Sequence, residues 1–316
     1  MDAPDRTTAP PVLPVANAPC SFGVDEIVPP DAWMPEPDEM LDWMVELDYA
    51  GTELGPPGYL GDGPTTRRRL AERGLRFVGS FLPQRFSHAE CVEEDRAWLR
   101  QSLELIREAT SEGSRPFAVL ADGLDEPVRQ RWSGAIEAHP EAWLSAERFE
   151  TFVANLHRAA ELCREAGFDV VIHPHAGTYL ETAGEIERLM ERLDPSLLGL
   201  CLDTGHFRFG GADPTASVHA YASLLRHVHL KDCSVAVLDE VRRSGLGFAE
   251  AVNRGVFVDL GQGDSGIAEV VGALREHDYR GWVVVEQDMF LDAADTRESI
   301  VASQRRNRAY LRGLGL

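Results

Sequence analysis

Cysteine is scarce in this 316-residue chain, and the few cysteines are widely scattered. They number five, an odd count without a CxxC pair, at Cys20, Cys91, Cys163, Cys201 and Cys233. Such a set argues against structural disulfides and favours a reducing compartment. The sequence also lacks the basic and apolar segments of a signal peptide, and it has no apolar run long enough to span a bilayer. We therefore expect a cytoplasmic protein.

Basic residues are outnumbered, with 31 Lys and Arg against 52 Asp and Glu, which gives a net charge of −21. Nucleic acid and anionic membrane surfaces are both bound largely through Lys and Arg. We therefore expect neither nucleic acid nor a membrane as a partner. The hydrophobic share of 44% is ample for a large core.

Short apolar runs alternate with helical patterns along almost the whole chain. Residues 1–16 are rich in Pro, Thr and Ala, and we expect a disordered leader there. Predicted strands lie at 18–23, 50–54, 76–81, 117–121, 169–173, 198–203, 226–230 and 282–287. Predicted helices lie at 37–48, 64–73, 91–111, 145–166, 182–193, 214–225 and 265–278. Helix-start chemistry supports two of them, with Thr182 and Glu185 forming a capping box and Asp213 preceding Pro214.

Eight strands alternating with helices predict the α/β class and a single-domain (β/α)₈ TIM barrel over residues 17–316. A doubly wound open sheet is the rival, but it usually has a glycine-rich phosphate turn after the first strand, and this chain has none. In a barrel, functional side chains gather at the carboxyl ends of the strands.

Ionisable residues follow the predicted strands at those ends. They are Glu53 after the second strand, His173, His175 and Glu181 after the fifth, Asp203 and His206 after the sixth, His229 and Lys231 on the seventh, and Glu286 on the eighth. Taken singly, each has a structural explanation, such as a hydrogen-bonded core histidine, a loop-capping aspartate or a solvated lysine. Four consecutive strands that carry such groups to one rim favour a functional site, because uncompensated burial of these groups is costly.

The mixture of carboxylates and imidazoles predicts one divalent metal ion. Mn²⁺, Mg²⁺, Co²⁺, Fe²⁺ and Zn²⁺ all suit these ligands, and the harder ions are favoured. Cys201 lies two residues before Asp203 but brings no second thiol. His227 and His229 share one strand face, and His229, nearer the rim, is the better candidate ligand.

Four motifs now point to a family. HPHAGTYLET, LGLCLDTGHFRFGGADP, HVHLKD and GWVVVEQD resemble, in order and spacing, the xylose-isomerase-like TIM-barrel superfamily of sugar isomerases and epimerases, which also contains endonuclease IV. The segment GTELGPPGYLG after the second strand is most similar to inosose (2-keto-myo-inositol) dehydratase-like proteins.

The resemblance implies a metal site made of one residue from each of strands five to eight. By motif, three of the ligands are Asp203, His229 and Glu286. The usual Glu of strand five is replaced by His173, so either His173 binds the metal or Glu181 folds back from the loop. We favour Glu181, since a third carboxylate better balances a hard dication. His206 resembles the substrate-binding His of the superfamily.

The function implied is that of a metal-dependent isomerase, epimerase or dehydratase, the last being a lyase. It would act on a keto-sugar or keto-cyclitol through a metal-stabilised enediolate, and the resemblance also allows a homo-oligomer. Candidate acids and bases are Glu53, His173, His175, His206 and Lys231. One alternative is a phosphodiesterase of the endonuclease IV type, which the acidic charge disfavours. Another is a non-catalytic barrel subunit, which the missing strand-five Glu keeps open.

Overall fold

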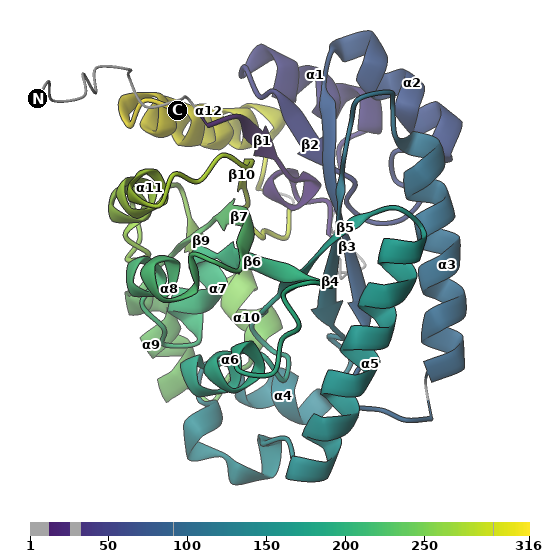
Figure 1. Ribbon diagram of the computed structural model, residues 1–316. Coiled ribbons are helices and arrows are strands. Elements are labelled where there is room, and N and C mark those ends of the chain that lie inside the picture. The colour runs from purple at the N-terminus through teal and green to yellow at the C-terminus, as the bar shows by residue number, and fades with distance from the viewer. Residues whose placement is uncertain (1–12, 26–32, 91, 293) are drawn as a thin grey trace, which may run out of the picture.

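Eight parallel strands close into a barrel in the computed structural model, which describes residues 13–25, 33–90, 92–292 and 294–316 (Figure 1). Each strand pairs with the next one along the chain, and the last pairs with the first. The strands are β1 (Val15–Asn17), β2 (Gly51–Glu53), β3 (Arg76–Gln84), β4 (Phe117–Asp122), β5 (Asp169–His173), β6 (Gly199–Asp203), β7 (Leu225–Leu230) and β10 (Val283–Val285).

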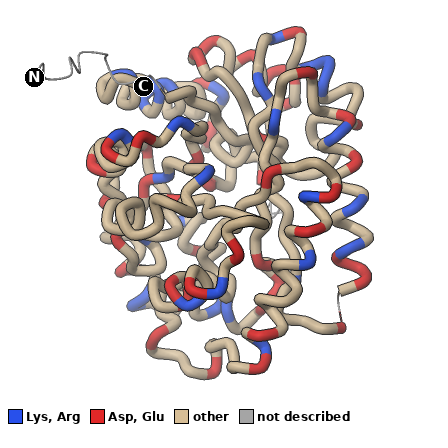
Figure 2. Tube along the Cα trace, in the orientation of Figure 1, with Lys and Arg blue, Asp and Glu red and all other residues tan. Residues whose placement is uncertain are grey.

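An outer helix follows each barrel strand and covers the barrel. These helices are α1 (Pro37–Glu46), α2 (Gly63–Arg73), α3 (Val92–Ala109), α5 (Ala146–Glu165), α6 (Ala183–Met190), α8 (Pro214–Tyr221), α11 (Ile267–Glu276) and α12 (Arg297–Gly313). Acidic and basic residues are interspersed on several of these helices, for example α3 (Figure 2). The predicted (β/α)₈ barrel is confirmed, and so are the helix starts at Thr182, with its capping box, and at Asp213, whose carboxylate accepts from Ala216 N.

The barrel interior is filled by small apolar residues below a polar layer. Ala16, Val78 and Val284 form one interior cluster, and Val119, Val171 and Cys201 form another. Side chains two residues apart on a strand point to the same side. The inward positions after Val171, Cys201 and Val284 are therefore His173, Asp203 and Glu286. The polar residues at the carboxyl ends thus lie directly above the apolar layer.

The first strand differs from its prediction. Val15–Asn17 forms β1, whereas residues 19–22, placed in the predicted strand 18–23, form the 3₁₀ helix η1 (Pro19–Phe22). Residues 1–12 of the predicted leader lie outside the described residues. Residues 13–16 are ordered in the barrel, since Pro14 O accepts from Val283 N at 3.1 Å. The predicted leader therefore does not extend to residue 16. Pro14 can precede a strand because its carbonyl oxygen still accepts a hydrogen bond.

Two large parts of the fold, and several short helices, lie outside the predicted elements. Between β7 and α11 the chain inserts α9 (Val235–Arg243) and α10 (Phe248–Asn253), flanked by the antiparallel pair β8 (Asp232–Cys233) and β9 (Phe257–Val258). This insert has a hydrophobic cluster of its own. The other part is α12, whose buried face includes Ser303, Gln304 and Asn307, so its apolar periodicity is weak. Shorter helices complete the fold: α4 (Pro127–Trp132), η2 (Ile136–Ala138), η3 (Pro140–Ala142) and α7 (Thr204–Phe209).

A buried polar network ties α12 to the ends of β1 and β10. Gln304 is fully buried; its Oε1 accepts from Asn17 Nδ2 at 3.0 Å, and its Nε2 donates to Ser21 O at 3.0 Å. Asn307 Nδ2 donates to Gln287 Oε1 at 3.1 Å. Gln287 points outward to this network, and so its neighbours in sequence face the barrel mouth. In the described part of the chain, no helix combines the length and apolar character that crossing a bilayer requires.

Replacing Gln304 with Ala removes the centre of this network. The buried amide of Asn17 and the carbonyl of Ser21 then lose partners, so we expect the free energy of unfolding to fall by about 1–3 kcal/mol. Equilibrium urea unfolding measures this. Gln101, exposed on α3, is the matched control, and its Ala variant should stay within about 0.5 kcal/mol of the wild type. Equal stability of the two variants would contradict the structural role of the network.

Candidate active site

Four buried side chains from four strands meet at the carboxyl end of the barrel. They are His173 from β5, Asp203 from β6, His229 from β7 and Glu286, which directly follows β10, and their ligand atoms all lie within 4.8 Å of one another. His229 Nδ1 is 3.3 Å from Glu286 Oε1 and 3.7 Å from Asp203 Oδ2. His173 Nε2 is 3.7 Å from the same Asp203 oxygen. The four side chains thus surround one common point.

Polar atoms at this point lack hydrogen-bond partners. Asp203 Oδ2 and His229 Nδ1 are buried and have no hydrogen-bond partner among the described residues. Buried polar atoms are nearly always paired, so this concentration of unpaired atoms calls for a further binding group. Nitrogen and oxygen ligands of this kind suit Mn²⁺, Fe²⁺, Co²⁺ or Zn²⁺. The residues present therefore fit a single divalent ion.

The two carboxylate oxygens of Asp203 have different roles. It is the N-cap of α7, and its Oδ1 accepts from Gly205 N at 2.8 Å and from His206 N at 2.9 Å. Its other oxygen is left facing the common point. Burial raises the pKa of Asp203, but the positive charge of Lys231 lowers it by more, so the carboxyl group stays ionised.

A thiol lies close enough to compete for the same position. Cys201 Sγ forms a second possible group with His173 and His229. Burial raises the pKa of Cys201 to about 12. Because the thiolate, not the thiol, is the metal ligand, the carboxylates of Asp203 and Glu286 are the better ligands here.

Lys231 Nζ lies among three carboxylates beside this group. It donates to Asp288 Oδ1 at 2.8 Å and to His206 Nε2 at 2.9 Å, and it lies 3.0 Å from Glu286 Oε2 and 3.4 Å from Asp203 Oδ2. Burial by itself lowers the pKa of Lys231, but the three carboxylates raise it well above its ordinary value. The group is therefore an ammonium ion.

Lys231 is also the only lysine in the chain, in which every other Lys or Arg position is arginine. The glycine of the Thr-Gly-His motif makes room for it, since a Cβ at Gly205 would come within 2.5 Å of Lys231 Cγ. The ammonium is a compact point charge on a flexible stem, which lets it approach several carboxylates.

Two further imidazoles lie under an apolar cover supplied by the insert. The rings of His175 and His206 are 3.7 Å apart, and Phe248 of α10 lies 5.3 Å from His175. Phe257 lies 5.4 Å from His206. Burial lowers the pKa of His175 to about 3 and that of His206 well below its ordinary value. Both imidazoles are therefore neutral and act through hydrogen bonds.

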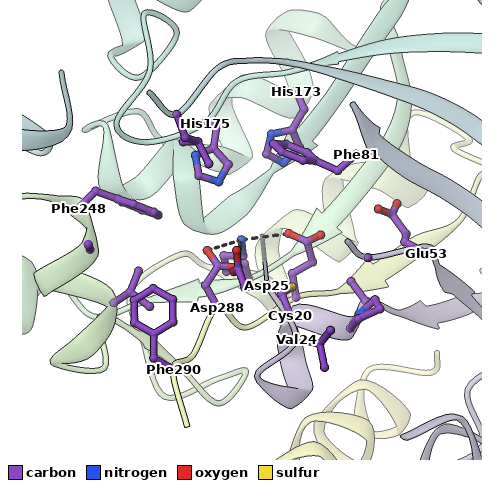
Figure 3. Close-up of a pocket in the computed structure, with 18 of the residues that line it drawn as sticks. Cys20, Val24, Asp25, Glu53, Phe81, His173, His175, Phe248, Asp288 and Phe290 are labelled. Atoms are coloured by element: carbon purple, nitrogen blue, oxygen red, sulfur yellow. Dashed lines mark hydrogen bonds and ion pairs between the residues drawn. The ribbon is translucent and has the colours of Figure 1, made fainter. Parts of the chain in front are cut away.

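His173, His175, Glu53, Lys231, Glu286 and Asp288 line a cavity at the barrel mouth. In Figure 3, His173 and His175 lie across the cavity from Asp25 and Asp288. Phe81, Phe248 and Phe290 supply apolar walls. Burial raises the pKa of Asp288 to about 7, against the opposing charge of Lys231.

Some cavity residues were not singled out from the sequence. Asp288 could have been found, because it lies two residues after Glu286 and so points the same way. Cys20 and Asp25, which line the cavity from the segment after β1, and Phe248 carry no comparable signal.

Glu181 is placed elsewhere, which corrects the expectation that it binds the metal. Its carboxylate accepts from Ser133 Oγ at 2.5 Å, Gly134 N at 2.6 Å and Gly177 N at 2.6 Å. It belongs to none of the groups whose atoms converge on a common point among the described residues. Thr182, the N-cap of α6, fixes the direction of the chain next to Glu181. Glu181 therefore connects two loops, and His173 is the residue from β5 that lies at the common point.

Glu53 reaches the cavity, but one of its oxygens is already engaged. Oε1 lies 2.7 Å from His227 Nε2 and 3.1 Å from His229 Nε2. Burial raises the pKa of Glu53, but His229 and His227 together lower it well below the ordinary value. Of the predicted residues, the structure thus brings together all except Glu181.

Comparison with known proteins identifies close relatives in sequence. Residues 41–306 match the model of a family described as "xylose isomerase-like TIM barrel". Inosose dehydratase of Geobacillus kaustophilus is 37% identical over 254 residues, which cover 79% of this chain and 80% of that protein. Inosose dehydratase of Geobacillus thermodenitrificans is 39% identical over 251 residues, or 79% and 82% of the two chains.

Solved structures share the fold at lower identity. A D-allulose 3-epimerase from Methylomonas sp. superposes with a TM-score of 0.68 at 15% identity, covering 96% of this chain and 97% of that one. A probable 3-DHS dehydratase from Bacillus anthracis gives 0.69 at 17% identity, covering 95% and 99%. At these identities the likeness shows the fold alone.

The ligand set can be tested by metal binding. We expect His173→Ala and Asp203→Asn to weaken Mn²⁺ binding at least tenfold, because each removes a ligand atom at the common point. Glu181→Gln is the control, a change at an equally buried carboxylate, and it should bind Mn²⁺ as the wild type does. Titration of metal-free protein followed by electron paramagnetic resonance measures the affinities. Lost binding in Glu181→Gln together with retained binding in His173→Ala would reverse the assignment.

Proposed function

Because the chain belongs to the xylose isomerase-like TIM-barrel family, we propose that it is a divalent-metal-dependent dehydratase of a keto-cyclitol. The observation that carries the proposal is the arrangement of the cavity. The four candidate ligands lie next to an ammonium, a carboxyl group and two neutral imidazoles. The two relatives named inosose dehydratase span about four fifths of the chain, which favours water removal from a six-membered ring over other reactions.

His173, Asp203, His229 and Glu286 would hold the ion. A divalent ion bound there would polarise a substrate carbonyl and so acidify the neighbouring C–H bond. This assignment removes His173 from the candidate acids and bases. Glu53 also leaves that set, since its Oε1 is committed to two imidazoles.

The remaining cavity groups can transfer the protons that dehydration needs. One group takes the proton from the carbon beside the carbonyl, and another protonates the hydroxyl that leaves from the next carbon, so that one water is lost. Asp288 lines the cavity and is held by Lys231, which makes it the candidate proton acceptor. Lys231 donates to the oxygen that gains negative charge, and His175, which lines the cavity, hydrogen-bonds a substrate hydroxyl.

Isomerisation and epimerisation would share the first proton removal and differ in where the proton returns. The endonuclease IV alternative requires a basic surface for DNA, which a net charge of −21 does not favour. The non-catalytic alternative gives no reason for a buried lysine among three carboxylates, an arrangement that is costly to maintain.

Dehydration can be distinguished from its alternatives by the product. With Mn²⁺ and 2-keto-myo-inositol, we expect a product lighter by one water, followed by mass spectrometry. Lys231→Met should lower kcat at least 10²-fold, the usual cost of removing a donor that stabilises developing negative charge, and should still bind Mn²⁺. Deuterium exchange from solvent without loss of mass would replace dehydration by epimerisation or isomerisation. Full activity of Lys231→Met would refute the role of the ammonium.

The charge of the cavity predicts which substrates are rejected. Lys231 is the only Lys or Arg among the described lining residues, and its Nζ is already surrounded by carboxylates. Even with a dication bound, acidic groups outnumber positive charges. We expect kcat/KM for a carboxylated cyclic ketone to be at least tenfold below that for an uncharged keto-cyclitol of equal ring size. Comparable values for the two would contradict this electrostatic selection.

A further inference from the structure

We propose that Glu53 is a positioning residue of the metal centre, which orients His229 and is itself held by His227. The inference rests on the metal centre of the proposed function, but it concerns how one ligand is prepared for binding. It assigns a structural reason to two buried residues, Glu53 and His227, that the reaction itself does not use.

The hydrogen bonds around His229 determine which nitrogen faces the metal. Its Nε2 lies 3.1 Å from Glu53 Oε1, and a carboxylate can only accept, so Nε2 carries the proton. A neutral imidazole protonated at Nε2 has its lone pair on Nδ1, and this atom has no hydrogen-bond partner among the described residues. That atom is the one near Asp203 and Glu286. Ligating histidines commonly donate their other N–H to a carboxylate, which fixes the ring and its tautomer.

His227 holds the same carboxylate from below. It is fully buried in the barrel interior, with its ring 5.0 Å from that of Phe117, and its Nε2 lies 2.7 Å from Glu53 Oε1. Its Nδ1 is buried without a partner in the described structure. An imidazole in the packed interior is costly, and His227 hydrogen-bonds Glu53 there. We infer that anchoring Glu53 compensates for this cost.

The backbone around Glu53 is shaped to admit the carboxylate. The pairing of β2 with β3 shifts register between Thr52 and Glu53, which turns the end of β2. On β3, Gly79 lies opposite, and a Cβ there would come within 2.8 Å of Glu53 Oε1. The space that a side chain at position 79 would fill is therefore occupied by the carboxylate.

The test is a double-mutant cycle on metal affinity, measured without substrate. We expect Glu53→Ala to weaken Mn²⁺ binding 10–100-fold, as is typical when a partner of a metal-bound histidine is removed. His227→Leu should weaken it by a smaller factor, because the hydrogen bond from His229 to Glu53 remains. The double variant should bind no more weakly than Glu53→Ala, since His227 acts only through Glu53.

Controls separate positioning from general damage. Urea unfolding of the metal-free variants reports any loss of stability, and Glu181→Gln, at a carboxylate of equal burial, should keep wild-type affinity. A Glu53→Ala affinity within twofold of the wild type, or additive effects in the double variant, would overturn the proposal. If the double-mutant cycle gives the expected affinities but no substrate is dehydrated, the positioning role of Glu53 stands and the proposed function fails. If the wild type binds no divalent ion, both proposals are overturned.

Discussion

The burial of opposite charges in one layer above the apolar barrel interior is the constraint on which the rest of the structure depends. Removing an ion from water costs several kcal/mol even after the protein relaxes. The carboxylates of Asp203, Glu286 and Asp288 are buried together, and Lys231 Nζ lies within 3.4 Å of an oxygen of each. The layer is therefore stable only as a set, which explains why so many of its atoms serve two partners.

Elements outside the barrel hold this layer in place. The first turn of α7 takes one oxygen of Asp203 and leaves the other free. The insert after β7 packs Phe248 against the rings of His175 and His206. Behind β10, the polar network of α12 fixes Gln287 and with it the direction of the two acids beside it. Each peripheral element thus contributes to the geometry of the cavity.

The chain contains one lysine and thirty arginines, and the two residue types serve different sites. Arginine serves the surface ion pairs of this chain, for example with Asp42 and Glu150, where its planar fork suits carboxylates. At the cavity the chain has an ammonium instead, packed against Gly205. A compact donor that can reach several oxygens at once suits a site where the charge of the ligand changes during reaction.

The sequence by itself determined the barrel, the position of seven of its eight strands, and the rim at which His173, Asp203 and Glu286 gather. The reason is that apolar strands alternate with helices and that side chains two apart share a face, and both properties are local. The tertiary structure alone decided that Glu181 joins two loops, that Glu53 contacts two imidazoles, and that Phe248 covers the cavity. Glu181 and Gly134 are 47 positions apart in the sequence, and Glu53 and His227 are 174 positions apart. Which donor hydrogen-bonds a given carboxylate depends on how the loops pack, and no local sequence pattern predicts that packing.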